Sequence, residues 1–252
     1  RSWSCYGIVF FQAEAGIRDY YASRGLGAVV MAALWWALPN TPAPKGGGLM
    51  AEIRVLGRGP VLAALALTVV GSSAMFTVFT YIAPILRDVT HASTNFVTGM
   101  LVLFGVGLTL GNVWGGKSAD RSVDRTLIIS LVVLIAVLLA FSVLMQWPLP
   151  AALSILLWGA ASFALVPPLQ MRVMEAAKDA PNLASAMNIG AFNFGNAIGA
   201  ALGGAVINAG LGYPAISLAG AIMAGLGLLM VLGLGWRARR AGLRTCPEAV
   251  QA

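Results

Sequence analysis

The stretch Gly116-Lys-Ser-Ala-Asp120-Arg121-Ser-Val-Asp124-Arg125 separates two long apolar segments of the sequence. Five of its ten residues are charged, whereas the 27 residues before it carry no charge. A run of about 20 mostly apolar residues is long enough to cross a bilayer as a helix. A short charged connection between two such runs predicts a loop at a membrane surface, and therefore an integral membrane protein.

The composition of the whole chain agrees with this prediction. Of its 252 residues, 59% are hydrophobic and 10% are charged, and the mean hydropathy is +0.84. Soluble domains carry about 25% charged residues. The two cysteines lie near opposite ends, at Cys5 and Cys246, so they predict neither a disulfide framework nor a zinc site. We expect no metal site and no cofactor.

Four uncharged runs are long enough to form membrane spans: residues 59–86, 89–116, 126–171 and 180–236. The third contains a proline turn at residues 146–150, and the fourth a glycine-proline turn at residues 210–214. We therefore expect an all-α membrane protein with a six-helix bundle over residues 49–240. The expected transmembrane helices are at about residues 60–83, 95–116, 126–146, 150–171, 183–209 and 213–236.

The distribution of basic residues predicts the orientation of the bundle. Twelve Lys and Arg residues fall in one alternating set of connections and flanks, whereas the other set contains only Arg87. Because basic residues favour the cytoplasmic side, both ends of the six-helix block are expected in the cytoplasm. The net charge of +7 is thus a topology signal and predicts no nucleic-acid partner. Contact with anionic membrane lipid is a secondary interpretation.

The two ends of the chain are less clearly assigned. Residues 26–38 form an apolar stretch of 13 residues that resembles part of a membrane helix, and residues 40–48 are typical of a Pro/Gly linker. Residues 1–24 match no pattern, and residues 241–252 are expected to be a cytoplasmic tail. Because no initiator Met is present, we expect the chain to be a fragment that begins inside a larger protein.

The charged loop resembles the cytoplasmic loop motif of the major facilitator superfamily, which runs roughly Gly-x-Leu-Ala-Asp-Arg-x-Gly-Arg-Arg. Matching positions are held by Gly116, Ala119, Asp120, Arg121 and Arg125, whereas Val123 and Asp124 depart from the motif. Residues 80–86 and 185–199 extend the similarity to the drug:proton antiporter branch, near its sugar- and arabinose-efflux-like members.

The resemblance covers about residues 50–240, and it implies the C-terminal six-helix half of a twelve-helix fold in a bacterial inner membrane. It also implies a missing N-terminal six-helix half as the partner.

The resemblance further implies that Gly116, Asp120, Arg121 and Arg125 form a conformational switch. The Asp120 carboxylate can accept hydrogen bonds at a helix N-terminus and pair with Arg121 or Arg125. Contacts that are made in one state and broken in another bias a two-state equilibrium. Alternatively, these charges only anchor a tight turn at the membrane interface. The departures at Val123 and Asp124 weaken the switch more than they weaken the family resemblance.

Uncharged polar and aromatic residues within the spans are candidates for lining a substrate cavity. Asn193 and Asn196 share a helix face, and Asn188 lies about 140° from Asn193 around the same helix. Amides inside a span need partners or water, so they favour the bundle interior. Hydrogen bonding between helices is an equally good interpretation for each of them, and for Asn112. The remaining candidates, for which packing or lipid contact is the commoner role, are Thr77, Thr80, Tyr81 and Trp158.

Two further patterns predict local geometry. Glycines recur every four residues, which predicts close helix packing, at Gly107, Gly111 and Gly115 and at Gly195, Gly199 and Gly203. Pro84 and the pair Pro167-Pro168 are expected to kink or end helices near the interface.

By resemblance, the expected function is proton-coupled efflux of a small molecule, such as a sugar or a drug-like compound, by alternating access. The six predicted spans contain no Asp, Glu, Lys, Arg or His, so a coupling group is expected in the missing half. A non-transporting receptor or assembly subunit with the same fold is the alternative. An intramembrane enzyme is disfavoured, because the single histidine, His91, lies outside the spans and no paired carboxylates lie within them.

Overall fold

The computed structural model describes residues 54–240, all within the compact unit Gly47–Ala252. The interpretations of residues 1–48, including the partial helix at 26–38 and the linker, lie outside the described residues, as does the tail at 241–252.

The described residues form eight helices, and these make six spans that are long and apolar enough to cross a membrane. This confirms the predicted all-α, six-span fold. The first and fourth spans each consist of two helices. In chain order the helices are α3 (Gly59–Phe79), α4 (Ile82–Asp88), α5 (Thr94–Ala119), α6 (Val123–Leu144), α7 (Pro148–Phe163), α8 (Val166–Ala176), α9 (Pro181–Asn208) and α10 (Tyr213–Arg240).

Prolines explain both breaks. A proline has no N–H, and its ring clashes with the carbonyl four residues earlier. Pro84 lies four residues after Thr80, where α3 has just ended, and Pro167 lies four residues after Phe163, the last residue of α7. In both places a second helix begins at once, so the spans continue to Asp88 and Ala176 rather than ending near residues 83 and 171 as predicted.

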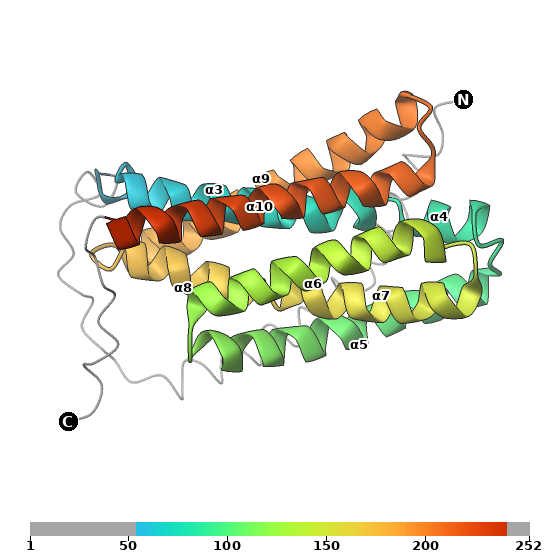
Figure 1. Ribbon diagram of the computed structural model, residues 1–252, viewed down its shortest axis with the longest axis horizontal. Helices are drawn as coiled ribbons and strands as arrows, with labels where there is room; N and C mark the ends of the chain where they lie inside the picture. The colour runs from blue at the N-terminus through green and yellow to red at the C-terminus, as the bar shows by residue number, and fades with distance from the viewer. Residues whose placement is uncertain (1–53, 241–252) are drawn as a thin grey trace, which may run out of the picture. The chain divides into compact units, whose positions relative to one another are not determined.

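Neighbouring helices follow the order α9–α3–α10–α6–α7–α5, and α8 contacts α3, α5, α6 and α9. Figure 1 shows α3, α9 and α10 in one group and α5, α6 and α7 in the other. The most extensive contact between the groups joins α10 to α6. Because α5 and α9 lie at the two ends of this order, each has one extensive helical neighbour. They are accordingly the two least buried spans.

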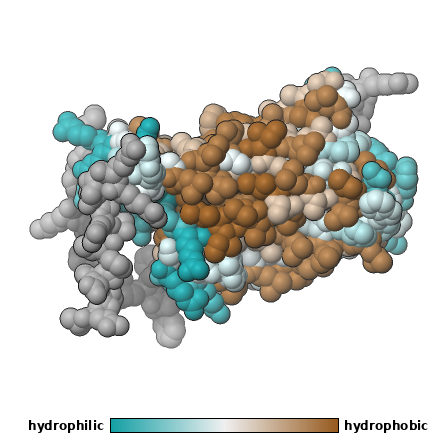
Figure 2. Space-filling view, viewed as in Figure 1, coloured by the Kyte–Doolittle hydropathy of each residue, from teal (hydrophilic) through white to brown (hydrophobic). Residues whose placement is uncertain are grey.

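The bundle has an apolar band between two polar ends (Figure 2). Exposed large aliphatic side chains cover the outward faces of α6 and α10, including Val132, Leu139, Ile222 and Leu229. A soluble protein rarely exposes an apolar surface of this extent, whereas hydrocarbon solvates it well. The surface therefore agrees with a transmembrane location.

The four-residue glycine spacing produces the predicted close packing. A Cβ atom added at Gly107, Gly111 or Gly115 would lie within 2.1–2.5 Å of a main-chain oxygen of the fourth span. Added Cβ atoms at Gly195, Gly199 and Gly203 would meet α3 and Tyr81 at 1.9–2.5 Å. Only glycine allows the backbones of α5 and α7, and of α9 and α3, to approach this closely.

Candidate functional site

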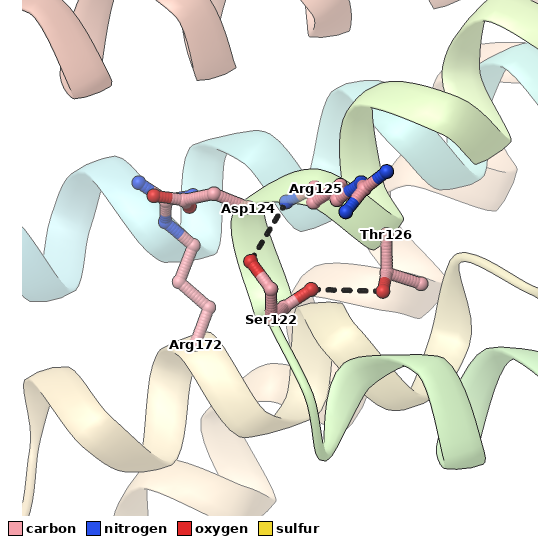
Figure 3. A network of polar contacts seen from close by, with 5 residues as sticks. All are labelled: Ser122, Asp124, Arg125, Thr126 and Arg172. Carbon is pink, nitrogen blue, oxygen red and sulfur yellow. Dashed lines mark hydrogen bonds and ion pairs between the residues drawn. The ribbon is translucent and has the colours of Figure 1, made fainter. Parts of the chain in front are cut away.

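The charged loop is shorter in the structure than in the sequence prediction. The helix α5 continues through Gly116 to Ala119, and Asp120 caps its end with its amide donating to the Gly116 carbonyl. Ser122 is the N-cap of α6: its Oγ accepts from the Arg125 amide at 3.4 Å, and its carbonyl accepts from Thr126 Oγ1 at 2.8 Å (Figure 3). Residues 120–122 are therefore a tight turn held by helix caps.

An ion pair joins this turn to the neighbouring span. The Arg172 guanidinium of α8 donates to the Asp124 carboxylate in the first turn of α6, while the Arg125 side chain points away (Figure 3). Asp124 also lies where a helix dipole favours negative charge. Asp124, which departs from the family motif, is thus the residue of this segment that pairs across helices.

The switch interpretation assigned a different pairing. Within residues 54–240 the ion pairs are Arg172–Asp124 and Arg58–Asp179, the latter at 2.7 Å between exposed side chains. The expected partnership of Asp120 with Arg121 or Arg125 is not among them. Asp120, Arg121 and Arg125 are exposed, and an added Cβ at Gly116 meets no atom within 4 Å. Among residues 54–240, Asp120, Arg121 and Arg125 therefore form an exposed surface at this end of the bundle, beside Gly116.

A chain of hydrogen bonds between polar side chains joins α3, α8 and α9. Thr68 of α3 donates to Asn188 Oδ1 of α9 at 2.8 Å, and Asn188 Nδ2 donates to Gln170 Oε1 of α8. Gln170 Nε2 in turn donates to Ser185 Oγ of α9 at 3.1 Å. Asn188 is 5% exposed, so both ends of its amide are satisfied by other helices rather than by an open cavity.

The structure separates the other cavity candidates by accessibility. Thr80, Asn112 and Asn193 are exposed, whereas Thr77 and Trp158 are buried. Thr77 Oγ1 donates to the Ser73 carbonyl at 2.7 Å, and Trp158 packs on Phe104 with ring centroids 4.6 Å apart. Asn112 and Asn193 therefore lie on the open faces of the two end helices, while Thr77 and Trp158 are part of the packing behind them.

Tyr81 and Asn196 are intermediate in their exposure to solvent. The Tyr81 hydroxyl donates to the Ala200 carbonyl at 3.0 Å, and this bond links the segment that follows α3 to α9. Asn196 is half-buried, and its Oδ1 is buried without a hydrogen-bond partner. The Trp158 indole N–H is likewise buried without a partner, so Asn196 and Trp158 are the two candidates with an unused hydrogen-bonding capacity.

The structure also brings in residues that the sequence interpretation did not select. Gln170, Thr68 and Arg172 all lie at contacts between spans. Gln170 could have been selected from the sequence, because an amide in an otherwise apolar span needs a hydrogen-bond partner. Neither Thr68 nor Arg172 could be paired with its partner from the sequence, because the partners are 120 and 48 residues away.

The fold and the loop agree with the comparison with known families. The family model of the Major Facilitator Superfamily matches residues 20–203. The chain belongs to this superfamily. It is 53% identical over 213 residues to the inner membrane transport protein YdhP of Escherichia coli (strain K12), covering 84% of this chain and 55% of the relative.

Two more distant relatives extend this comparison. The uncharacterized MFS-type transporter YfhI of Bacillus subtilis (strain 168) is 34% identical over 205 residues, which cover 81% of this chain and 52% of the relative. A probable sugar efflux transporter of Helicobacter pylori (strain P12) is 31% identical over 213 residues, covering 84% of this chain and 52% of the relative. The chain thus spans about half the length of the curated relatives it matches.

Proposed function

We propose that this chain is the C-terminal six-helix half of a twelve-helix transporter of a bacterial inner membrane, with both ends of the bundle in the cytoplasm. The name of the E. coli relative, and the fact that the 213 aligned residues cover only 55% of it, support this assignment. Among the described basic residues, Arg58, Lys117, Arg125, Arg172 and Arg237 lie at the helix ends around the 120–122 turn, whereas Arg87 lies at the opposite end. The positive-inside rule then favours a cytoplasmic location for the turn.

The observation that carries the proposal is the chemistry of α9, one of the two end helices. The exposed face of α9 consists mainly of small and amide residues, such as Gly190, Asn193, Ala197 and Ala201. The exposed face of α5 includes Thr109 and Asn112, but large apolar residues such as Val106, Leu110 and Val113 are exposed beside them. Lipid contact favours the large aliphatic residues seen on α6 and α10, whereas small and polar residues favour helix contacts or water. The exposed face of α9 therefore suits contact with a second bundle and a path between the two bundles.

In this arrangement, Thr80, Asn112, Asn193 and Asn196 contact the substrate, and Thr77, Tyr81, Trp158 and Asn188 hold the helices that carry them. Amides and hydroxyls suit a ligand with several hydroxyl groups, such as a sugar, and the aromatic residues also suit a drug-like compound. The H. pylori relative, named as a sugar efflux transporter, favours export. The substrate binds between the two halves, which rock about it in alternating access.

The turn acts as the cytoplasmic switch. The Asp124–Arg172 pair holds the start of α6 to α8 within this half, which leaves Asp120, Arg121 and Arg125 exposed. These three charged residues, together with the open surface at Gly116, contact the other half when the cytoplasmic side closes. Proton coupling depends on an ionisable group in the other half, because the hydrocarbon-spanning segments of this one carry none.

The test is efflux from proteoliposomes that contain the full-length transporter and a labelled sugar or drug. We expect saturable efflux driven by a proton gradient. Asn193→Ala and Asn196→Ala should lower the rate or raise KM, whereas Leu229→Ala on the lipid-facing side of α10 should not. Equal rates for all three variants would remove α9 from the substrate path. Saturable flux from residues 1–252 alone would contradict the need for a second half.

A further inference from the structure

The short helix α8 makes polar contacts with two different parts of the bundle. Arg172 donates to the Asp124 carboxylate at the start of α6, beside the charged turn (Figure 3). Two residues earlier, Gln170 bonds to α9, where it accepts from Asn188 and donates to Ser185. Side chains two apart on a helix point about 200° apart, so the two contacts lie on opposite sides of α8. The helix α8 is therefore bonded both to the turn and to α9.

The break between α7 and α8 weakens the connection of α8 to the rest of its own span. The helix α7 ends at Phe163, and Pro167 and Pro168 in the first turn of α8 have no N–H with which to continue its hydrogen bonds. Because α8 is only 11 residues long, its position depends strongly on its contacts with α3, α5, α6 and α9. A force applied at Arg172 therefore moves α8 more easily than it would move an unbroken span.

The contact with α8 also helps to set the direction in which α9 faces. Gln170 bonds two positions one turn apart on α9, and Thr68 of α3 donates to the Asn188 amide at 2.8 Å. The close glycine contacts between α9 and α3 begin at Gly195, so these hydrogen bonds help to hold the part of α9 that precedes it. Asn193 lies about 140° from Asn188 and is exposed, whereas Asn188 points inward. Turning α9 at Asn188 therefore turns Asn193 as well.

We propose that α8 couples the charged turn to the substrate-facing side of α9, with Arg172 and Gln170 as the positioning residues. This coupling rests on the proposed function, in which the turn contacts the other half and Asn193 contacts the substrate. When the turn gains or loses its contact with the other half, Asp124 shifts Arg172, and α8 passes the shift through Gln170 to Asn188. Because coupling between two sites is reciprocal, substrate bound at Asn193 also changes the strength of the contact at the turn.

The experiment follows the orientation of α9 through the reactivity of a single thiol. The full-length transporter carries Asn193→Cys, with its native cysteines replaced by serine, in vesicles of phosphatidylethanolamine and phosphatidylglycerol. The probe is a fluorescent maleimide in excess. Arg172→Ala should change the labelling rate by roughly two- to thirtyfold, the range expected for a residue that transmits coupling without contacting either site. Asp124→Asn breaks the same pair from the turn and should have the same effect, whereas Arg172→Lys retains the cation and should stay near the parent rate.

Two further variants separate coupling from a general loss of structure. Lys178→Ala is the matched control: Lys178 is an exposed cation just after α8, it takes part in neither ion pair of residues 54–240, and its loss should leave the rate unchanged. In a Gln170→Ala background, Arg172→Ala should have little further effect, because the bond from α8 to α9 is already absent. Melting temperatures identify any variant that does not fold, and Asp124→Asn then takes the place of Arg172→Ala.

Equal labelling rates for the parent, Arg172→Ala and Asp124→Asn would overturn the coupling. It would also be overturned if Arg172→Ala had as large an effect in the Gln170→Ala background as in the parent, because the shift would then reach α9 by another route. Efflux of the labelled sugar or drug is measured separately. The expected labelling without saturable efflux would contradict the proposed function, whereas saturable efflux with unchanged labelling would contradict only the coupling.

Discussion

Replacing Gly111 by alanine tests the close packing of α5 on α7. The new Cβ would lie 2.1 Å from the Ala160 carbonyl oxygen, 2.7 Å from its carbonyl carbon and 2.8 Å from its Cα. Carbon–oxygen contacts of this kind normally begin at about 3.3 Å, so the helices must separate locally by about 1 Å. No side-chain rotation can relieve the contact, because all three atoms belong to the main chain.

The cost of this separation extends along the helix pair. A gap of 0.5–1 Å forfeits about a quarter to a half of each dispersion contact. Gly107 and Gly115 pack on the same span through equally close contacts and would lose them together. Overpacking typically costs about 1–3 kcal/mol, and we expect Gly111→Ala to lie at the upper end of that range. Helix propensity opposes this by about 1 kcal/mol, since alanine favours a helix over glycine.

Gly105→Ala provides the matched control. Gly105 lies in the same helix, and a Cβ added there meets no atom within 4 Å. It carries the same propensity gain without the clash, so it should be neutral or slightly stabilising. The free energy of unfolding can be compared by SDS titration in mixed micelles, with helix content followed by circular dichroism. Equal stability for the two variants would refute the argument from main-chain contact.

Three other predictions concern the polar contacts and the turn. Arg172→Ala should lower stability by less than about 1 kcal/mol because Asp124 is half exposed. The charge exchange Asp124→Arg with Arg172→Asp should restore part of the loss, since it re-forms the pair but places a cation at the start of α6, as measured by melting temperature at low salt. Asn188→Ala should cost about 1–3 kcal/mol by removing the donor to Gln170 Oε1. Adding Gln170→Ala should cost less than the two single effects summed in a double-mutant cycle, and full additivity would show that the pair does not interact. Gly116→Val should leave the melting temperature nearly unchanged, since a Cβ there meets no atom, yet slow efflux by blocking approach of the other half; unchanged efflux would remove Gly116 from the switch.

Much of the fold could be predicted from the sequence because each span must satisfy its own backbone hydrogen bonds. Apolar length therefore located all six spans, and the charged stretch at 116–125 marked a connection between two of them. Helix ends were less predictable. A helix can continue past the hydrocarbon into charged residues, as at Asp88 and Arg172, and proline can interrupt a span without ending it.

The sequence predicted which types of residue the candidate site contains, but not how they are arranged. Amides in apolar spans need either a hydrogen-bond partner on another helix or a cavity, and the sequence could not decide between these two for Asn188 or Asn193. The structure places Asn188 between Thr68 and Gln170, and it places Asn193 on an open face. The two differ because they point in different directions from one helix, of which only one direction is covered by α3 and α8.

The sequence by itself thus determined that this is a six-span membrane protein with a charged turn typical of one superfamily, since length, hydropathy and charge act locally along the chain. The tertiary structure alone decided which charges and amides meet. Asp124 pairs with Arg172 and Asn188 with Gln170, while Asp120 and Arg121 stay exposed at the turn. Those pairings depend on how helices far apart in the sequence pack against one another, which local sequence patterns do not determine.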